Sequence, residues 1–109
     1  MSKTLEKLLE RAQLKGEAIL NGRMSYWGGG KGELEEKYAI SIENDILELR
    51  HWGTTTLIID MHGQSILEWY GEGNSDRDSM NFILSKFDIN GRFKYRPSID
   101  EFSLVEKER

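Results

Sequence analysis

The residues that could carry acid–base or metal chemistry do not form a complete catalytic set. His51 and His62 are the two histidines of the chain, with a predicted turn between their strands. Pairing of antiparallel strands could bring them together, with Asp60 as a third ligand of a metal ion. The simpler interpretation makes His51 an ordinary strand residue and His62 an exposed turn residue. We therefore predict no metal site and no cofactor.

Nucleophilic and hydrolytic chemistry has no better support. The chain has no cysteine, which excludes thiol catalysis, thiolate metal sites and disulfides. None of its serines lies in a nucleophile elbow, and Lys31, between glycines, lacks the spacing of a phosphate-binding loop. Asp76 and Asp78 could act as paired carboxylates, but the start of a helix accounts for both. We expect a protein that is not an enzyme.

Aromatic residues beside glycines and acids are better candidates for binding. Tyr26 and Trp27 lead into Gly28–Gly32, a glycine-rich segment that is either a connector or an adaptable binding loop. Trp52 and Tyr70 lie on the faces opposite the presumed core residues of their strands, so each is either exposed or covered by a second layer. The predicted partner-binding residues, aromatic anchors within an acidic rim, are Tyr26, Trp27, Trp52, Tyr70, Glu72 and Asp76.

The charge balance narrows the classes of partner. Fifteen basic and nineteen acidic side chains give a net charge of -4, which argues against a general nucleic-acid binder. The acidic middle of the chain could imitate a nucleic-acid backbone in a basic groove, although a solvated surface is the simpler interpretation. Arg92, Lys94 and Arg96 alternate on one strand and form a basic patch. They support an alternative function, in which the protein binds a nucleotide or another phosphate-bearing ligand.

These candidates must be positioned by helices and strands that the hydrophobic pattern predicts. Leu5, Leu8, Leu9 and Ala12 have helical spacing near the N-terminus. That helix could stop at Gly16 or at Asn21-Gly22, and we favour the later stop. A loop over residues 23–32, with a short strand over 24–27 as an option, leads into the strands.

Four alternating runs then predict an antiparallel meander: residues 38–42, 46–52, 54–61 and 65–70. Ser75-Asp76-Arg77-Asp78 resembles a capping box that opens a helix over 75–87. Residues 93–95 form a fifth strand that Pro97 stops, and residues 101–105 are a candidate sixth. The predicted core residues are Leu49, Leu57, Ile59, Leu67, Trp69, Met80, Ile83, Leu84 and Phe87.

Together these elements predict a single α+β domain over residues 1–109. An antiparallel meander sheet of 4–6 strands would pack with an N-terminal helix and a second helix near 75–87. Charges interrupt each apolar stretch, so neither a signal peptide nor a membrane span can be drawn. We expect a cytoplasmic protein that does not contact a membrane.

Two segments carry a resemblance to known proteins: His-Trp-Gly-Thr-Thr-Thr-Leu-Ile-Ile-Asp from His51, and Trp-Tyr-Gly-Glu-Gly-Asn-Ser-Asp-Arg-Asp-Ser-Met-Asn from Trp69. The stretch from His51 to Leu84, about a third of the chain, resembles small uncharacterised proteins encoded by bacteriophages and prophages. The resemblance transfers no activity to named residues. It implies a phage accessory protein, a group in which inhibitors of host defence are common, anti-CRISPR proteins among them. The implied partner is a host protein, such as a CRISPR effector or another defence component, with no direct contact to nucleic acid.

Overall fold

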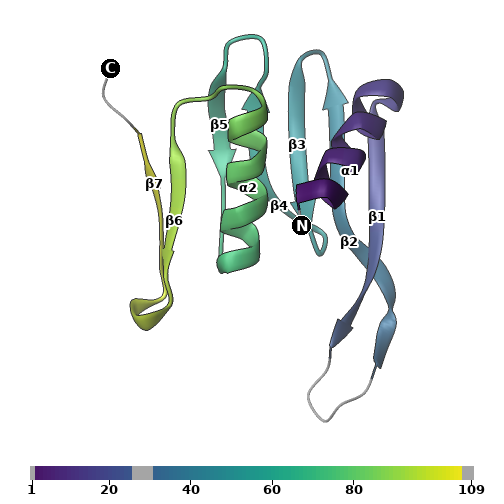
Figure 1. Cartoon of the computed structure of the whole chain (residues 1–109), viewed down its shortest axis with the longest axis vertical. Coiled ribbons are helices and arrows are strands. Elements are labelled where there is room, and N and C mark those ends of the chain that lie inside the picture. The colour runs from purple at the N-terminus through teal and green to yellow at the C-terminus, as the bar shows by residue number, and fades with distance from the viewer. Residues whose placement is uncertain (1, 26–30, 107–109) are drawn as a thin grey trace.

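Two helices cover one face of a five-stranded sheet, and a two-stranded sheet lies beside it (Figure 1). The computed structural model describes residues 2–25 and 31–106. Its elements in chain order are α1 (Ser2–Lys15), β1 (Glu17–Ser25), β2 (Lys31–Glu43), β3 (Ile46–His51), β4 (Thr54–Asp60), β5 (Ser65–Trp69), α2 (Asn74–Lys86), β6 (Arg92–Arg96), a short 3₁₀ helix (Pro97–Ile99) and β7 (Glu101–Val105). The predicted α+β class is confirmed.

The large sheet is an antiparallel meander in the order β1-β2-β3-β4-β5. Asn44 and Asp45 both have positive φ, 50° and 66°, in the tight turn between β2 and β3. Asparagine and aspartate tolerate this left-handed conformation better than most residues. The turn therefore lies where the sequence pattern placed it.

The first helix is shorter than predicted, because it ends at Lys15 and not at Asn21-Gly22. Gly16 has φ 85° and donates its N–H to the Ala12 carbonyl at 2.7 Å, as in a glycine-terminated helix. The Gly16 carbonyl then accepts the Ile42 N–H, which starts the pairing of β1 with β2. Residues 17–22, which helical spacing alone would assign to the first helix, therefore belong to the strand β1.

The predicted loop over residues 23–32 is also wrong at both ends. The backbone of β1 continues to Ser25 and that of β2 begins at Lys31, and these two residues are opposite each other. The predicted short strand over 24–27 overlaps the end of β1 and otherwise lies outside the described residues. Tyr26, Trp27 and Gly28–Gly30 lie outside them as well.

The core lies between the sheet and the two helices. Six predicted core residues have no exposed surface: Leu49, Leu57, Ile59, Met80, Ile83 and Leu84. Phe87, at the end of α2, packs against this cluster but is only partly buried. Burying a large aliphatic side chain contributes about 1.5–3 kcal/mol, so this layer holds α2 on the sheet.

The burial predicted for Leu67 and Trp69 is wrong, since their side chains are 55% and 37% exposed. The reason is a β-bulge: Ile59 pairs with Ile66 and Leu57 with Trp69, so β5 has one more residue than β4 in this interval. Ile66 therefore packs on the core beside the buried strand residues. Trp69 is opposite the buried Leu57, and its partial exposure follows from its place on the edge strand β5, where its ring packs against Phe93 of β6 at 5.3 Å between ring centroids.

The two sheets are joined through α2 and an aromatic cluster. The Asn81 amide bonds to both backbone groups of Phe93, with distances of 2.7 Å to its nitrogen and 3.0 Å to its oxygen. Phe102 of β7 stacks near Trp69 and lies so close to Gly71 that an added Cβ would overlap its ring. The strands β6 and β7 pair with each other and are held on the molecule by these contacts.

Candidate functional site

A hollow of about 650 Å³ opens where the β3–β4 turn, the end of β5 and the start of α2 meet. It is called the Trp52 hollow below. Its described lining consists of His51, Trp52, Thr54, Thr56, Tyr70, Glu72, Gly73, Asn74, Ser75 and Asp76. This lining contains two carboxylates and two large aromatic side chains, and it contains neither lysine nor arginine.

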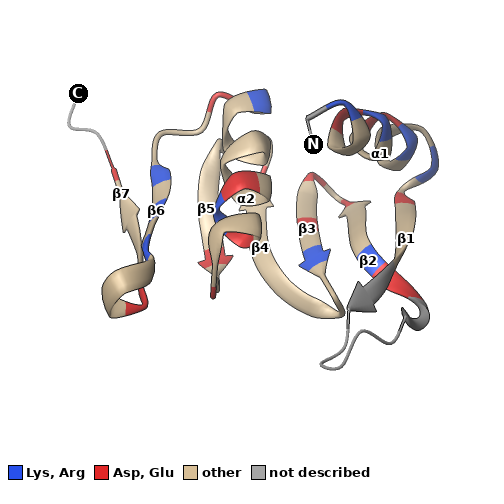
Figure 2. Cartoon of the chain, turned by 60° about the horizontal axis from the view of Figure 1, so that its bottom comes forward, with Lys and Arg blue, Asp and Glu red and all other residues tan. Residues whose placement is uncertain are grey.

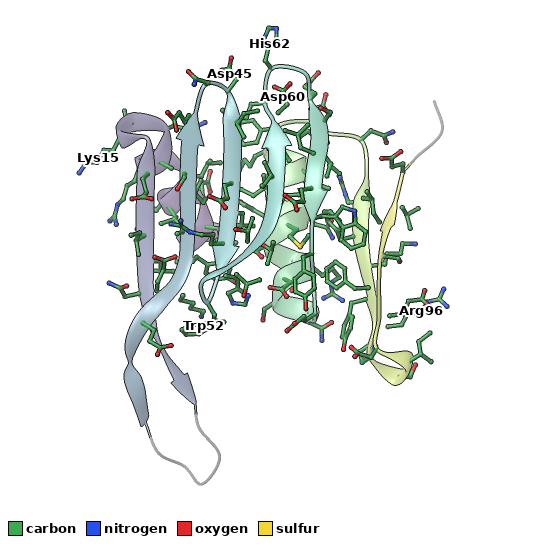
Figure 3. All side chains as sticks on the ribbon, turned by 180° about the vertical axis from the view of Figure 1, so that it is seen from behind. Lys15, Asp45, Trp52, Asp60, His62 and Arg96 are labelled. Carbon is green, nitrogen blue, oxygen red and sulfur yellow. The ribbon has the colours of Figure 1, made fainter. Side chains whose placement is uncertain are left out.

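The position of Trp52 follows from a tight hairpin turn. Trp52 and Gly53 have φ 50° and 81°, which is the pair of positive values that a type I′ turn requires. The Trp52 N–H donates to the Lys37 carbonyl at 2.8 Å, which ties the turn to β2. Figure 3 shows Trp52 at one end of the sheet, with Asp60 and His62 at the other.

The opposite wall is the segment that leaves β5. The Tyr70 N–H donates to the Thr56 carbonyl at 2.9 Å, while the Tyr70 side chain remains 49% exposed. Its hydroxyl donates a hydrogen bond to the carboxylate of Glu72. This hydrogen bond, together with partial desolvation and the nearby negative charges, raises the pKa of Tyr70 above 10.0. Tyr70 therefore stays a neutral donor beside Glu72.

The start of α2 differs from the predicted capping box. Gly73 is the N-cap and makes no side-chain capping hydrogen bond, so Ser75 does not cap the helix. Asp76 instead accepts the Glu72 N–H on one oxygen at 2.9 Å and lies 2.6 Å from His51 Nδ1 with the other. The carboxylate thus connects the loop after β5 with the end of β3.

His51 is held from two sides. Its ring stacks on Tyr38 with centroids 4.4 Å apart and planes 9° from parallel. Because a carboxylate only accepts, the hydrogen between His51 and Asp76 belongs to Nδ1. Their side chains are 11% and 13% exposed. Burial raises the pKa of the Tyr38 phenol and outweighs the opposing effect of its hydrogen bond with Ser79, and the charges of Asp76 and Asp78 add smaller upward contributions.

Hydrogen bonding and burial act in opposite directions on Asp76. Burial is the largest influence and by itself would raise the pKa of this carboxyl. The hydrogen bonds from His51 and from the Glu72 N–H, with the charge of His51, outweigh it and lower the pKa below 3.8. Asp76 is therefore a stable negative charge in the lining of the hollow at neutral pH.

A carboxylate on Nδ1 is also the arrangement that orients a catalytic imidazole. Within the described residues, however, the side-chain hydrogen bonds of His51 end at Asp76, and no hydroxyl nucleophile is joined to it. His51 is opposite Thr54 in the sheet, whereas Asp60 is opposite Ile46, so the metal-ligand trio weighed above is not assembled. The described part of the chain brings no three acidic, histidine or cysteine side chains together as a metal site.

Four of the six predicted partner-binding residues meet in the Trp52 hollow: Trp52, Tyr70, Glu72 and Asp76. Tyr26 and Trp27 lie outside the described residues. Arg92, Lys94 and Arg96 are exposed on β6 and do not line the hollow; Figure 3 shows Arg96 across the molecule from Trp52.

Sequence reasoning missed the part played by His51. It treated His51 as an ordinary strand residue or as a metal ligand beside His62 and Asp60, and it did not connect His51 with Asp76. The sequence does indicate that His51 lies at an end of the sheet, because a turn follows it directly. It does not indicate that α2 begins at that same end, which is what brings Asp76 to His51.

No protein-family model, curated protein or solved structure matches the chain. In the part of the chain that the structure describes, neither helix combines the length and apolar composition needed to cross a bilayer.

Proposed function

We propose that this protein is a non-enzymatic accessory protein of the phage type that binds and inhibits a host protein, and that the Trp52 hollow is its contact surface. The observation that carries the proposal is the convergence of Trp52, Tyr70, Glu72 and Asp76 from three separate parts of the chain. The phage origin and the choice of a defence component as partner follow from the resemblance.

The chemistry of the hollow supports binding to a protein. Trp52 and Tyr70 supply aromatic area, and such residues dominate the binding energy of many interfaces. Glu72 is exposed at the edge and Asp76 is held below it. Acidic groups around aromatic anchors speed association with a positively charged partner and select against other partners.

The shape of the hollow also suits this role. A volume of about 650 Å³ lies within the range typical of pockets that take a drug-sized ligand. Tyr70 and Glu72 in its lining are exposed, so a side chain projecting from a protein surface can reach them. Figure 2 shows acidic positions in red along α2, which borders the hollow.

Affinity capture from bacterial lysate tests the proposal. The baits are the wild type, Trp52→Ala, Glu72→Gln and, as a matched control, Glu101→Gln, an exposed acid on β7 that does not line the hollow. Loss of an aromatic anchor weakens an interface by about 2 kcal/mol, or roughly thirtyfold. We expect a partner that the wild type and the control recover and that Trp52→Ala does not.

The partner is then purified, and its activity is measured with each variant present. Inhibition by the wild type and by Glu101→Gln, with little inhibition by Trp52→Ala, would support the proposal. Equal recovery of the partner by all four baits would reject the hollow as the contact surface. A Trp27→Ala bait tests the predicted anchors that lie outside the described residues.

The alternative is that the protein sequesters a nucleotide or another phosphate-bearing signal. It is favoured by the exposure of Arg92, Lys94 and Arg96 at alternating positions on β6. Phe93 and Tyr95 lie on the opposite face of the strand, so no aromatic residue of β6 adds to a ligand site there. Stabilisation by one member of a nucleotide panel, with loss of the shift in Arg96→Gln, would favour this alternative.

A further inference from the structure

The charges around the Trp52 hollow are unbalanced. Its described lining holds the carboxylates of Glu72 and Asp76 and no lysine or arginine. Lys37 lies outside this lining, with its Nζ 5.9 Å from the centroid of the Tyr38 ring that stacks on His51. A group that enters the hollow therefore meets the exposed carboxylate of Glu72, with no described lysine or arginine beside it in the lining.

Both carboxylates are fixed in place and retain acceptor capacity. A carboxylate has about four lone-pair sites. Asp76 uses two of them, for His51 and for the Glu72 N–H. Glu72 accepts the Tyr70 hydroxyl and is otherwise exposed. An entering donor can therefore bond to Glu72 without displacing an internal partner, while Asp76 adds attraction from below.

The aromatic side chains select the kind of cation. Trp52 and Tyr70 line the same hollow, and aromatic faces attract cations, with tryptophan the strongest. A guanidinium group is planar, stacks on aromatic rings, and donates two parallel hydrogen bonds to one carboxylate. An ammonium group is compact and strongly hydrated, so it uses such walls less well.

We propose that the Trp52 hollow receives an arginine side chain of the partner protein, stacked on the aromatic walls and paired with Glu72. This inference rests on the proposed function, because it names the group of the partner that the hollow recognises. It follows from the juxtaposition of aromatic faces, a free carboxylate edge and the absence of basic lining residues in the described part of the site.

A small-molecule titration tests this without the partner. The probes are N-acetyl-arginine amide and N-acetyl-citrulline amide, which have nearly the same shape but differ in charge. The readout is the indole N–H signal of Trp52 in a ¹⁵N-correlation spectrum, assigned with Trp52→Phe. We expect a saturable shift with the arginine probe in the millimolar range and none with citrulline.

The matched variants distinguish recognition of the arginine charge by Glu72 from nonspecific binding of the probe. Glu72→Gln keeps the size of the side chain and should weaken arginine binding about fivefold, the effect of losing an exposed ion pair. Glu101→Gln should bind as the wild type does. Equal shifts with citrulline, no saturable shift with arginine, or unchanged affinity in Glu72→Gln would each overturn the proposal.

The failures of the two proposals can be told apart. If the arginine probe fails while capture of the partner still depends on Trp52, the hollow binds another group and the proposed function stands. If the probe binds but no variant of the hollow affects capture, the proposed function fails. Self-association that Glu72→Gln abolishes would assign the hollow to a second copy of the chain and would overturn the inference.

Discussion

At the scale of the residue, Asp76 has the most consequential set of contacts. It holds the His51 ring with one oxygen and the backbone of Glu72 with the other. Sequence analysis assigned it to a helix cap and, separately, to an acidic rim. In the structure, Asp76 instead holds the loop that contains Glu72 against the end of β3.

The lowered pKa of Asp76 predicts an acid-dependent contribution to stability. Because the pKa in the folded protein lies below the ordinary value of 3.8, this contribution is fully present above about pH 4 and is lost as the pH falls through the folded-state pKa. We expect Asp76→Asn to reduce the free energy of unfolding at neutral pH, with the difference from the wild type shrinking toward pH 2. Urea denaturation at a series of pH values measures it.

Asp78→Asn is the control for this prediction, since it removes the same charge from a side chain that is 46% exposed. Its loss of stability at neutral pH should be smaller than that of Asp76→Asn, because an exposed ion pair such as that with Arg77 contributes little. An Asp76→Asn difference that stays constant down to pH 2 would show that the His51 contact does not favour the charged carboxylate.

At the scale of the element, α2 organises two parts of the molecule. Its apolar face covers the sheet, while Asn81 supplies one donor and one acceptor to Phe93, as a neighbouring strand would. The hydrophobic pattern predicted the first role because it depends on spacing within the helix. The second role depends on which strand lies beside the helix, and no local pattern contains that information.

Replacement of Asn81 by leucine should destabilise the protein. The change keeps the approximate volume but leaves the N–H and the carbonyl of Phe93 without their partner, at a cost of about 2–4 kcal/mol. Ser85→Ala, an exposed site on the same helix, should change stability by less than about 0.5 kcal/mol. Equal free energies of unfolding for the two variants would contradict a structural role for Asn81.

At the scale of the whole molecule, one close backbone contact adds to α2 and the aromatic cluster in joining the two sheets. Gly71 follows β5, and the ring of Phe102 on β7 occupies the space that a Cβ at Gly71 would need. The central strands have further support, because the core to which they contribute also contains buried residues of α1 and α2.

Gly71→Ala should therefore loosen the small sheet selectively. We expect a loss of about 1–3 kcal/mol from overpacking, with amide hydrogen exchange accelerating first in β6 and β7. Gly73→Ser is the control, since nothing lies within 4 Å of a Cβ there and a hydroxyl can cap α2. Uniform acceleration across β2, β3 and β4 in Gly71→Ala would refute the selective effect.

The predictions were correct for segments whose structure is determined by their own local sequence pattern. Alternation placed β3 and β4, helical spacing placed α2, and Leu49, Leu57 and Ile59 are buried as predicted. The predictions were wrong for segments whose structure is determined by contacts with a distant part of the chain. The pairing with β2 made residues 17–25 a strand, and the bulge opposite β4 left Leu67 exposed.

The sequence by itself determined the α+β class, the meander and the aromatic and acidic residues suited to binding, because period, turn chemistry and side-chain type are local properties. Only the tertiary structure decided that Trp52, Tyr70, Glu72 and Asp76 share one hollow and that His51 is bound to Asp76. Those facts depend on the end of the sheet at which the chain leaves β5 and begins α2. That choice is made by packing between segments far apart in the chain, where the free energy of burial outweighs local preference.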